Sequence, residues 1–506
     1  MNPDECPRAY EYYGKPLTIA GFNLIDEVGI LGSLSSGFQL SRDECMQLLI
    51  DKTGDMVLAE RYLGSTLDYL YIQGILDFNG GRYSLTSSGG DLLYNKKNLK
   101  ELVGTYGPLS ALSAYESFGE GEVMTLRDCN VDVGQIVGNE FLQDVLVVPA
   151  IAILREVRLE LEELNLTQAL VQRGRFDMQD IERRGEPANL HFLLDALKAK
   201  GLITGSGGRV IATKAGMEVF KNPGYAQYIL SYYATYGALP ELGIGQVIYD
   251  QVKWDQPGFV GRHPGHNAKG SGDILGYRVL PFIETLFRED GALYDYALES
   301  GFDGLTLVSF GPGDGKVCRS TVGDTDGCVQ RSVGVELSVG AIAHATALDA
   351  SAGLSSNIGY IHGSMINEDD VRRLGEMAQS SSLGIVGETS FIPHDIGLAN
   401  TGEFLHLYRK YFPGSPIIIN ESFEVPIEVM HKCRSHQPPS FWYSHKVSGQ
   451  QLAPSQVWRD LFRECGFREM VAANGDLVGR VHSSIADRTI PTIKTMVLEP
   501  ISGFTS

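Results

Sequence analysis

Short runs of apolar residues recur through the second half of the chain, each followed by a segment long enough to form a helix. Four of these runs are Leu307–Phe310, Ser332–Val335, Ile358–Ile361 and Ser382–Val386. Apolar runs of this length, bounded by Gly and polar residues, are typical of buried strands. Because they alternate with helical segments, they predict a doubly wound parallel sheet in an α/β domain.

The first half of the chain contains an internal repeat. Residues 66–89 match residues 193–216 without a gap, at a constant offset of 127 residues. Each copy predicts a helix with Leu at positions i and i+3, a Gly that ends the helix, and a hairpin with Gly-Gly at its tip. This pattern predicts two winged-helix-like modules within a mostly helical N-terminal region.

The composition indicates a folded protein with an acidic balance. The chain has 506 residues, of which 43% are hydrophobic, and a formal net charge of −20. This length suits about two to four domains. Since affinity for nucleic acid depends on Lys and Arg contacts, we expect no nucleic-acid partner. A transcription regulator that binds DNA through its winged helices is therefore the less favoured alternative.

The cysteines and the N-terminus indicate a compartment. The seven Cys residues form no C-x-x-C pair, and their number is odd, which favours reduced thiols. The segment Met1–Cys6 is acidic where a signal peptide would be basic, and no run of about 18 apolar residues occurs. We expect a cytoplasmic protein that does not contact a membrane.

The strongest chemical signal is a glycine-rich turn directly after the first apolar run. Gly311, Gly313 and Gly315 alternate with other residues, Asp314 lies among them, and Glu336 ends the second apolar run. Closely spaced glycines let the backbone approach a ligand, and an acid one strand later suits a ribose diol. The spacing G-x-G-x-G, without the longer gap of the dinucleotide fingerprint, favours S-adenosylmethionine over a nicotinamide cofactor.

This turn resembles the first motif of the class I S-adenosylmethionine-dependent methyltransferases. The resemblance covers roughly residues 240–500 and implies a Rossmann-like domain with activity in class EC 2.1.1. It also implies that Ser364 and Met365, after the third apolar run, lie at the adenine. The sequence departs from the family at Ser309, because the family usually carries an acid two residues before the first glycine.

A second resemblance involves His394 and Asp395, which follow the fourth apolar run. The segment Gly387–Gly397 places an imidazole just beyond the carboxyl end of a strand, the edge at which open α/β sheets bind ligands. The His-Asp pair resembles that of plant-type small-molecule O-methyltransferases, which implies that His394 is a general base for a substrate hydroxyl.

The tail of the chain offers a different assignment. Residues 441–467 resemble the last part of the same superfamily, and iron-dependent C-methyltransferases of 2-oxo acids, of the phenylpyruvate and 2-ketoarginine types, hold a metal with two histidines at about these places. The resemblance implies that His394 and His445 hold one metal ion, with Asp395, Asn420 and Glu421 as candidate third ligands or supporting groups. A chelated 2-oxo acid would enolise more readily. Iron, zinc and copper all remain open.

The segment between the two halves is rich in Gly, His and cationic groups. Residues 258–272 predict either a mobile substrate loop or an ordinary linker, and Arg262 and Lys269 are candidates to bind a substrate carboxylate. The segment Gly270–Gly272 resembles a similar Gly-Ser-Gly segment in the loading-module methyltransferase domains of the apratoxin and saxitoxin synthases. This resemblance implies a malonyl-type substrate.

These observations predict four segments. They are a first winged-helix-like module (1–110), a second one (111–240), a linker with a substrate loop (241–295) and a methyltransferase domain (296–506). In small-molecule methyltransferases, such modules cap the substrate cavity and form homodimers, and we expect the same here.

The leading hypothesis is a metal-assisted C-methyltransferase. Its substrate would be a small 2-oxo acid, with 2-oxoarginine as a cationic candidate, or a malonyl compound. The alternative is a metal-independent O-methyltransferase in which His394 is the general base.

Overall fold

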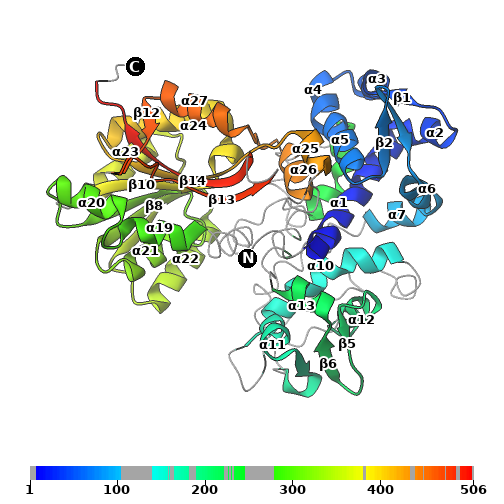
Figure 1. Ribbon diagram of the computed structural model, residues 1–506, viewed down its shortest axis with the longest axis horizontal. Coiled ribbons are helices and arrows are strands. Elements are labelled where there is room, and N and C mark those ends of the chain that lie inside the picture. The colour runs from blue at the N-terminus through cyan, green and yellow to red at the C-terminus, as the bar shows by residue number, and fades with distance from the viewer. Residues whose placement is uncertain are drawn as a thin grey trace. The chain divides into compact units, whose positions relative to one another are not determined.

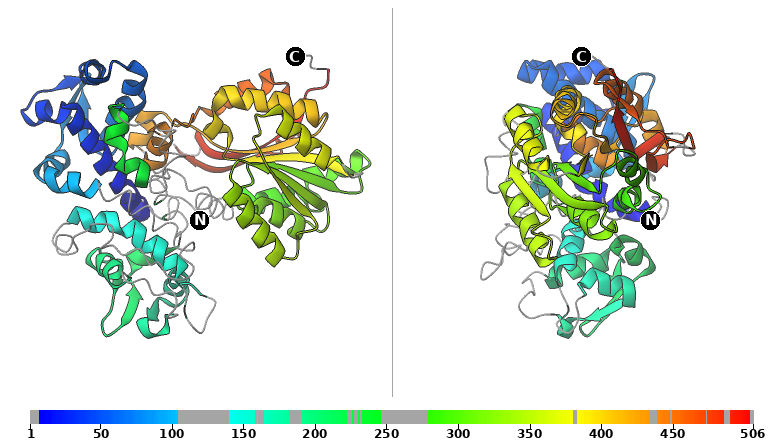
Figure 2. Two further views of the ribbon diagram at one scale, coloured as in Figure 1. Left: turned by 180° about the vertical axis from the view of Figure 1, so that it is seen from behind. Right: turned by 90° about the vertical axis from the view of Figure 1, so that its left-hand side faces the viewer.

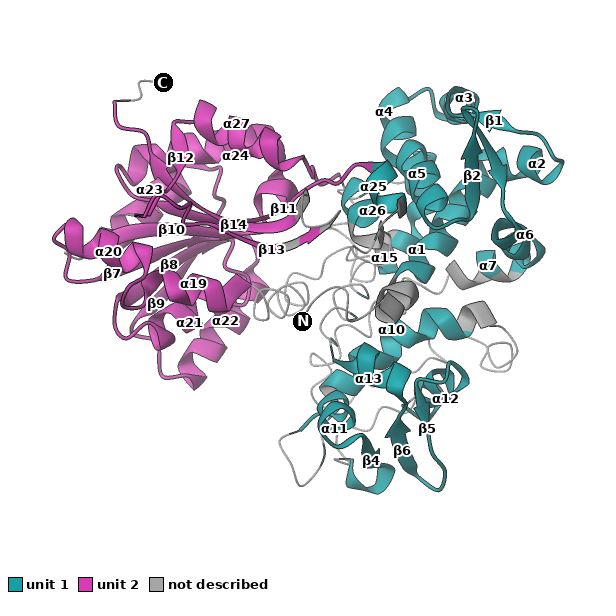
Figure 3. Ribbon diagram, in the orientation of Figure 1, with its two compact units in different colours: residues 1–270, 427–448 teal, residues 271–426, 449–506 magenta. Residues whose placement is uncertain are grey.

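The computed structural model divides the chain into two compact units (Figure 3). Unit 1 comprises Met1–Gly270 and Ile427–Ser448, and unit 2 comprises Ser271–Pro426 and Gly449–Ser506. The structure describes residues 7–103, 140–157, 159, 164–181, 190–221, 226, 230, 233–245, 279–379, 383–432, 439–447, 449–472, 474–485 and 490–503. In this part of the chain, no helix combines the length and the apolar character that crossing a membrane requires.

Unit 2 is built on a mixed sheet. Its strands are β7 (Leu305–Phe310), β8 (Val329–Glu336), β9 (Ile358–His362), β10 (Gly384–Ser390), β11 (Ile417–Ser422), β12 (Phe467–Glu469), β13 (Arg480–Ile485) and β14 (Ile490–Pro500). The order is β12-β14-β11-β10-β7-β8-β9, and β13 pairs with β14. Strands β7 to β11 are parallel, whereas β14 is antiparallel to β11. This confirms the predicted α/β sheet, which is mixed because β14 runs antiparallel to the parallel strands.

Helices cover both faces of this sheet (Figures 1 and 2). They are α19 (Leu280–Phe287), α20 (Ala292–Glu299), α21 (Lys316–Asp324), α22 (Val339–Ser351), α23 (Glu368–Ala378), α24 (Pro393–Tyr411) and α27 (Ser455–Glu464). Alternate residues of β7 point to opposite faces, as expected of a strand. Leu307 packs in the core beneath α19 and α21, and Val308 packs in the core beneath α23 and α24.

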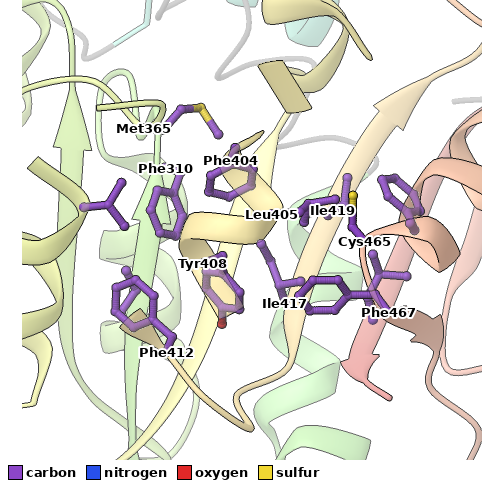
Figure 4. Close-up of a cluster of buried hydrophobic side chains, with 14 of the residues drawn as sticks. Phe310, Met365, Phe404, Leu405, Tyr408, Phe412, Ile417, Ile419, Cys465 and Phe467 are labelled. Atoms are coloured by element: carbon purple, nitrogen blue, oxygen red, sulfur yellow. The ribbon is translucent and has the colours of Figure 1, made fainter. Parts of the chain in front are cut away.

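The second of these cores is organised around one aromatic side chain. Phe310, at the end of β7, makes edge-on contacts with Phe404, Tyr408 and Phe412, at centroid distances of 4.8, 5.8 and 6.0 Å (Figure 4). All four side chains are fully buried. These contacts fix the end of β7, and therefore the start of the glycine turn, against α24.

Unit 1 is mostly helical and contains two small three-stranded sheets. Its helices are α1 (Pro7–Val28), α2 (Ile30–Ser35), α3 (Arg42–Thr53), α4 (Met56–Leu58), a π-helical turn (Ala59–Gly64), α5 (Ser65–Ile72), α6 (Ser87–Tyr94), α7 (Lys96–Val103), α10 (Glu140–Glu156), α11 (Leu166–Arg173), α12 (Leu190–Ala199), α13 (Lys214–Phe220), α15 (Tyr233–Gly237), α16 (Leu239–Gly243), α25 (Ile427–Lys432) and α26 (Pro439–Val447). The sheets are β1-β3-β2 (Leu40–Ser41, Arg82–Leu85, Leu76–Asn79) and β4-β6-β5 (Arg175–Asp177, Arg209–Ala212, Ile203–Thr204).

The internal repeat recurs in the hydrogen bonds of unit 1. The Thr86 hydroxyl donates to the carbonyl of Gly74 at 2.7 Å and accepts from the backbone N–H of Gly89 at 3.1 Å. Its counterpart Thr213 makes the equivalent bonds at 2.7 and 3.0 Å, and each Thr caps the helix that follows its hairpin. The two copies share these local elements, whereas their description as winged helices stays a prediction.

The compact units divide the chain differently from the four predicted segments. Unit 2 begins at Ser271 and includes α19, which lies in the predicted linker, and α20, which begins in that linker and ends beyond it. Residues 427–448, inside the predicted methyltransferase domain, belong to unit 1. The predicted boundaries therefore stay predictions.

The repeat predicts a glycine requirement that can be tested on neighbouring residues. A Cβ atom at Gly89 would lie 2.4 Å from the carbonyl oxygen of Ile75, whereas Gly90, in the same helix, has no atom within 4 Å. We expect Gly89→Ala to lower the free energy of unfolding by about 1–3 kcal/mol. The matched control Gly90→Ala should raise it by about 0.5–1 kcal/mol. Urea unfolding measures both, and equal effects would contradict the close packing.

Candidate functional site

The glycine turn joins β7 to α21 at the carboxyl end of the parallel strands. Gly311, Gly313 and Gly315 have φ angles of 72°, 57° and 73°, a region that favours glycine. A Cβ atom at Gly311 would lie 2.8 Å from the side chain of Ile392, and one at Gly315 would lie 2.2 Å from the Tyr360 hydroxyl oxygen. Two of the three glycines are thus required by the packing of the chain itself, in addition to any approach of a ligand.

Glu336 lies beside this turn, as the sequence predicts. Its Oε2 accepts from the backbone N–H of Gly313 at 3.1 Å, and its Oε1 accepts from the backbone N–H of Ser338 at 2.9 Å. These bonds orient the carboxylate before any ligand arrives. Because a carboxylate has about four lone-pair sites, both oxygens can still accept from a diol.

Asp314 is the acidic residue within the turn. Its Oδ1 accepts from the backbone N–H of Lys316 at 3.0 Å, and Arg319 donates to its carbonyl oxygen at 2.5 Å. Burial raises the pKa of the Asp314 carboxyl, and the nearby Arg319 opposes this effect. Arg319 also forms an ion pair with Asp349 at 3.1 Å. These contacts tie the turn to α21 and α22.

Ser364 and Met365 follow β9. The Ser364 backbone N–H donates to Asp370 at 2.9 Å, which anchors this loop to α23. Met365 is 7% exposed and packs in the core under α23 and α24 (Figure 4). Both residues lie at the carboxyl end of the sheet, and their predicted role at an adenine stays a prediction.

His394 lies in the first turn of α24, directly after β10. The strand β10 extends to Ser390, so it continues beyond Val386, where the predicted apolar run ends. Phe391 has a φ of 59° and Gly397 has a φ of 81°, and these two residues bracket one helical turn. A positive φ at a bulky residue is strained, so neighbouring contacts must hold the turn in place.

Glu421 of β11 supplies those contacts. Its Oε1 lies 2.5 Å from the His394 Nδ1 and accepts from the backbone N–H of Ser422 at 2.5 Å, and its Oε2 accepts from the backbone N–H of His394 at 3.0 Å. The side chain of Glu421 is fully buried, and His394 is 2% exposed. Residue 421 lies within β11, so its side chain is placed by the sheet.

This arrangement selects one form of the imidazole. A carboxylate accepts a hydrogen bond from Nδ1–H, so in neutral His394 the Nε2 carries the lone pair. Asp395 Oδ1 lies 3.6 Å from Nε2 and accepts from the Gln450 side chain. The His394 carbonyl accepts from the backbone N–H of Gln451 at 2.7 Å, so the segment after unit 1 returns to this turn.

The other candidate residues belong to other parts of the chain. His445 is on α26 of unit 1 and is 1% exposed, whereas His394 belongs to unit 2. Arg262 and Lys269, with the rest of residues 258–272, lie outside the described residues. Within the described ranges, no three His, Cys, Asp or Glu side chains are grouped as metal ligands. The predicted metal pair stays a prediction.

A buried acid that the sequence analysis did not single out lies next to Ser309. Glu388 on β10 is the register partner of Ser309 on β7, and its Oε2 accepts from the Ser309 hydroxyl at 2.7 Å. Its Oε1 accepts from the Ser390 hydroxyl, which in turn accepts from Asn420 at 2.8 Å. The signal for Glu388 was a lone acid at an inward position of an otherwise apolar strand.

Comparison with known proteins gives structural neighbours only. No family model and no curated protein matches the chain. The solved structures include the mitomycin 7-O-methyltransferase MmcR, at 12% identity and a TM-score of 0.43, with 72% of this chain and 98% of that chain covered. An O-methyltransferase family protein from Burkholderia thailandensis matches at 11% identity and a TM-score of 0.44, with 76% and 100% covered. Similarity at this level assigns neither a substrate nor a reaction.

The His394–Glu421 contact predicts a tautomer. In ¹⁵N NMR spectra of the neutral imidazole, we expect His394 to carry its proton on Nδ1, because Glu421 accepts from that atom. His406 is exposed on the same helix α24 and serves as a solvated reference. Glu421→Gln should weaken the preference at His394 and leave His406 unchanged. Protonation of neutral His394 mainly at Nε2 would contradict the assignment.

Proposed function

We propose that this chain is an S-adenosylmethionine-dependent methyltransferase of class EC 2.1.1 that methylates a hydroxyl group of a small molecule. The observation that carries the proposal is the buried His394–Glu421 pair at the carboxyl edge of the sheet. A carboxylate that orients an imidazole is the usual support for a general base. The pair lies in the same unit as the glycine turn.

The residues of the turn fit this cofactor. Glu336, fixed by two backbone N–H groups, would accept from the ribose hydroxyls, and the turn from Gly311 to Gly315 would lie along the ligand. Asp314, Ser364 and Met365 are proposed contacts at the same edge. When bound, S-adenosylmethionine would supply a methyl group on a positively charged sulfur.

His394 would then act on the substrate. As the substrate oxygen forms its bond to the methyl carbon, the carbon–sulfur bond breaks and its electron pair goes to sulfur. The hydroxyl proton passes to Nε2 of His394, and Glu421 stabilises the imidazolium that forms. Asp395, 3.6 Å from Nε2, adds a second negative group on the same side of the ring.

Metal-assisted C-methylation of a 2-oxo acid, such as 2-oxoarginine, or of a malonyl compound is the second candidate. The proximity of Nε2 and Asp395 Oδ1 favours it, because these atoms offer two donors to one ion. The donors do not fit a complete site, since the described residues offer no group of three and Glu421 already holds the ring and two backbone N–H groups. We therefore derive no step through iron or another metal.

Unit 1 would serve the same reaction. We propose that its two repeated modules cap the substrate or form a homodimer, and that Arg262 and Lys269 bind an acidic substrate group. A cytoplasmic location is part of this proposal. The acidic net charge of −20 supports a small-molecule partner over a nucleic acid.

Replacing His394 tests the proposed base. We expect His394→Ala to lower turnover of a hydroxylated substrate by about 10²–10⁴-fold, the usual contribution of a general base. Binding of the cofactor should be unchanged, because the imidazole acts on the substrate. The matched control is His406→Ala, at an exposed position of α24, which should retain full activity.

A chelator separates the two candidates. Activity on a panel of phenols and 2-oxo acids is measured with and without chelator in wild-type protein. Chelator-resistant methylation of a hydroxyl is expected. Loss of activity that added iron restores, together with a 2-oxo acid substrate, would overturn the O-methylation proposal in favour of the metal-assisted one.

A further inference from the structure

Glu388 is a buried acid that the proposed reaction does not use. It lies in the middle of the sheet on β10, between β7 and β11, and is 1% exposed. Its hydrogen-bond partners among the described residues are the hydroxyls of Ser309 and Ser390 and the side-chain amide of Asn420. Burial raises the pKa of the Glu388 carboxyl, which these neutral donors only partly offset.

A carboxylate in such a place is costly without a cation. Hydroxyl and amide donors are weaker partners than an ionic group, and moving a carboxylate out of water is unfavourable. Among the described residues, no Lys, Arg or His forms an ion pair with Glu388, whereas the buried Asp349 is paired with Arg319. Among the described residues, the Glu388 carboxyl therefore has neutral partners and no cationic one.

The position of Glu388 relates it to the glycine turn. Its register partner Ser309 lies two residues before Gly311, and Ser390, which bonds to it, is the last residue of β10. The Glu388 carboxyl therefore lies on the strand next to position 309, at which class I methyltransferases usually carry an acidic residue. Ser309 donates to that carboxyl in place of carrying a charge itself.

We propose that Glu388 binds the α-ammonium group of the amino-acid end of S-adenosylmethionine, so that the adjacent strand supplies the negative charge that position 309 lacks. This rests on the proposed function. An ammonium group has N–H donors for the remaining lone pairs of the carboxylate, whereas a sulfonium has none. Ser309 and Ser390 orient the two oxygens toward it.

Calorimetric titration of the full chain with three ligands tests this assignment. S-adenosylmethionine and S-adenosylhomocysteine both carry the ammonium group, and 5′-methylthioadenosine lacks it. Glu388→Gln should weaken binding of the first two by about 10- to 100-fold, the range of a lost charge-assisted hydrogen bond. Binding of 5′-methylthioadenosine should be unchanged. The control Glu403→Gln, at an exposed position of α24, should alter none of the three.

A rescue variant adds a result that a structural role would not give. Ser309→Asp combined with Glu388→Gln returns an acid to the neighbouring strand and should recover part of the lost affinity. Glu388→Asp, which keeps the charge but withdraws it by one methylene, gives a second test if Glu388→Gln does not fold. Glu388→Asp should weaken the binding of S-adenosylmethionine and of S-adenosylhomocysteine.

Each other outcome overturns the proposal in a distinguishable way. Unchanged affinity for all three ligands in Glu388→Gln would remove the assignment and leave the proposed function intact. Weakened binding of S-adenosylmethionine alone would indicate that the carboxyl faces the sulfonium. Failure of the wild-type chain to bind any of the three ligands would contradict the proposed function itself.

Discussion

The candidate site depends on one buried carboxylate, that of Glu421, and on the three N–H groups that surround it. Those donors are the ring and backbone of His394 and the backbone of Ser422. A charge buried in a sheet is unfavourable unless it accepts hydrogen bonds from such donors. If the turn after β10 moved away, the Glu421 carboxylate would lose two of them, both from His394. This constraint holds Phe391 at its positive φ and keeps the imidazole in one orientation. The same contacts that stabilise the turn therefore prepare its chemistry.

Three acids lie toward the carboxyl edge of one sheet, and their different surroundings give them different capacities. Glu336 is held by backbone N–H groups and keeps both oxygens available as acceptors. Glu421 is bound to an imidazole and stabilises its positive form. Glu388 is bound by neutral donors, the Ser309 and Ser390 hydroxyls and the Asn420 amide, and forms no ion pair among the described residues. In the proposed function, a ribose, a transferred proton and an ammonium group would meet these three environments.

Local patterns were sufficient to predict much of the fold. The four apolar runs became β7 to β10, and the repeat became matching helices, hairpins and Thr caps, because each signal lies within a few residues. The membership of His445 in unit 1 could not be predicted, since it depends on a chain that leaves one unit after Pro426 and returns at Gly449. Likewise, the roles of Glu421 and Glu388 arise from pairing between strands that are distant in sequence. The register between paired strands cannot be read from a single sequence.

The most direct test of the account is a crystal structure of the full chain with S-adenosylhomocysteine bound. The account predicts the adenosine ribose within hydrogen-bond distance of Glu336, and His394 still bonded to Glu421 with Nε2 directed toward the space beside the sulfur. A ligand bound elsewhere, or a His394 ring that turns away from Glu421 when the site is filled, would contradict it.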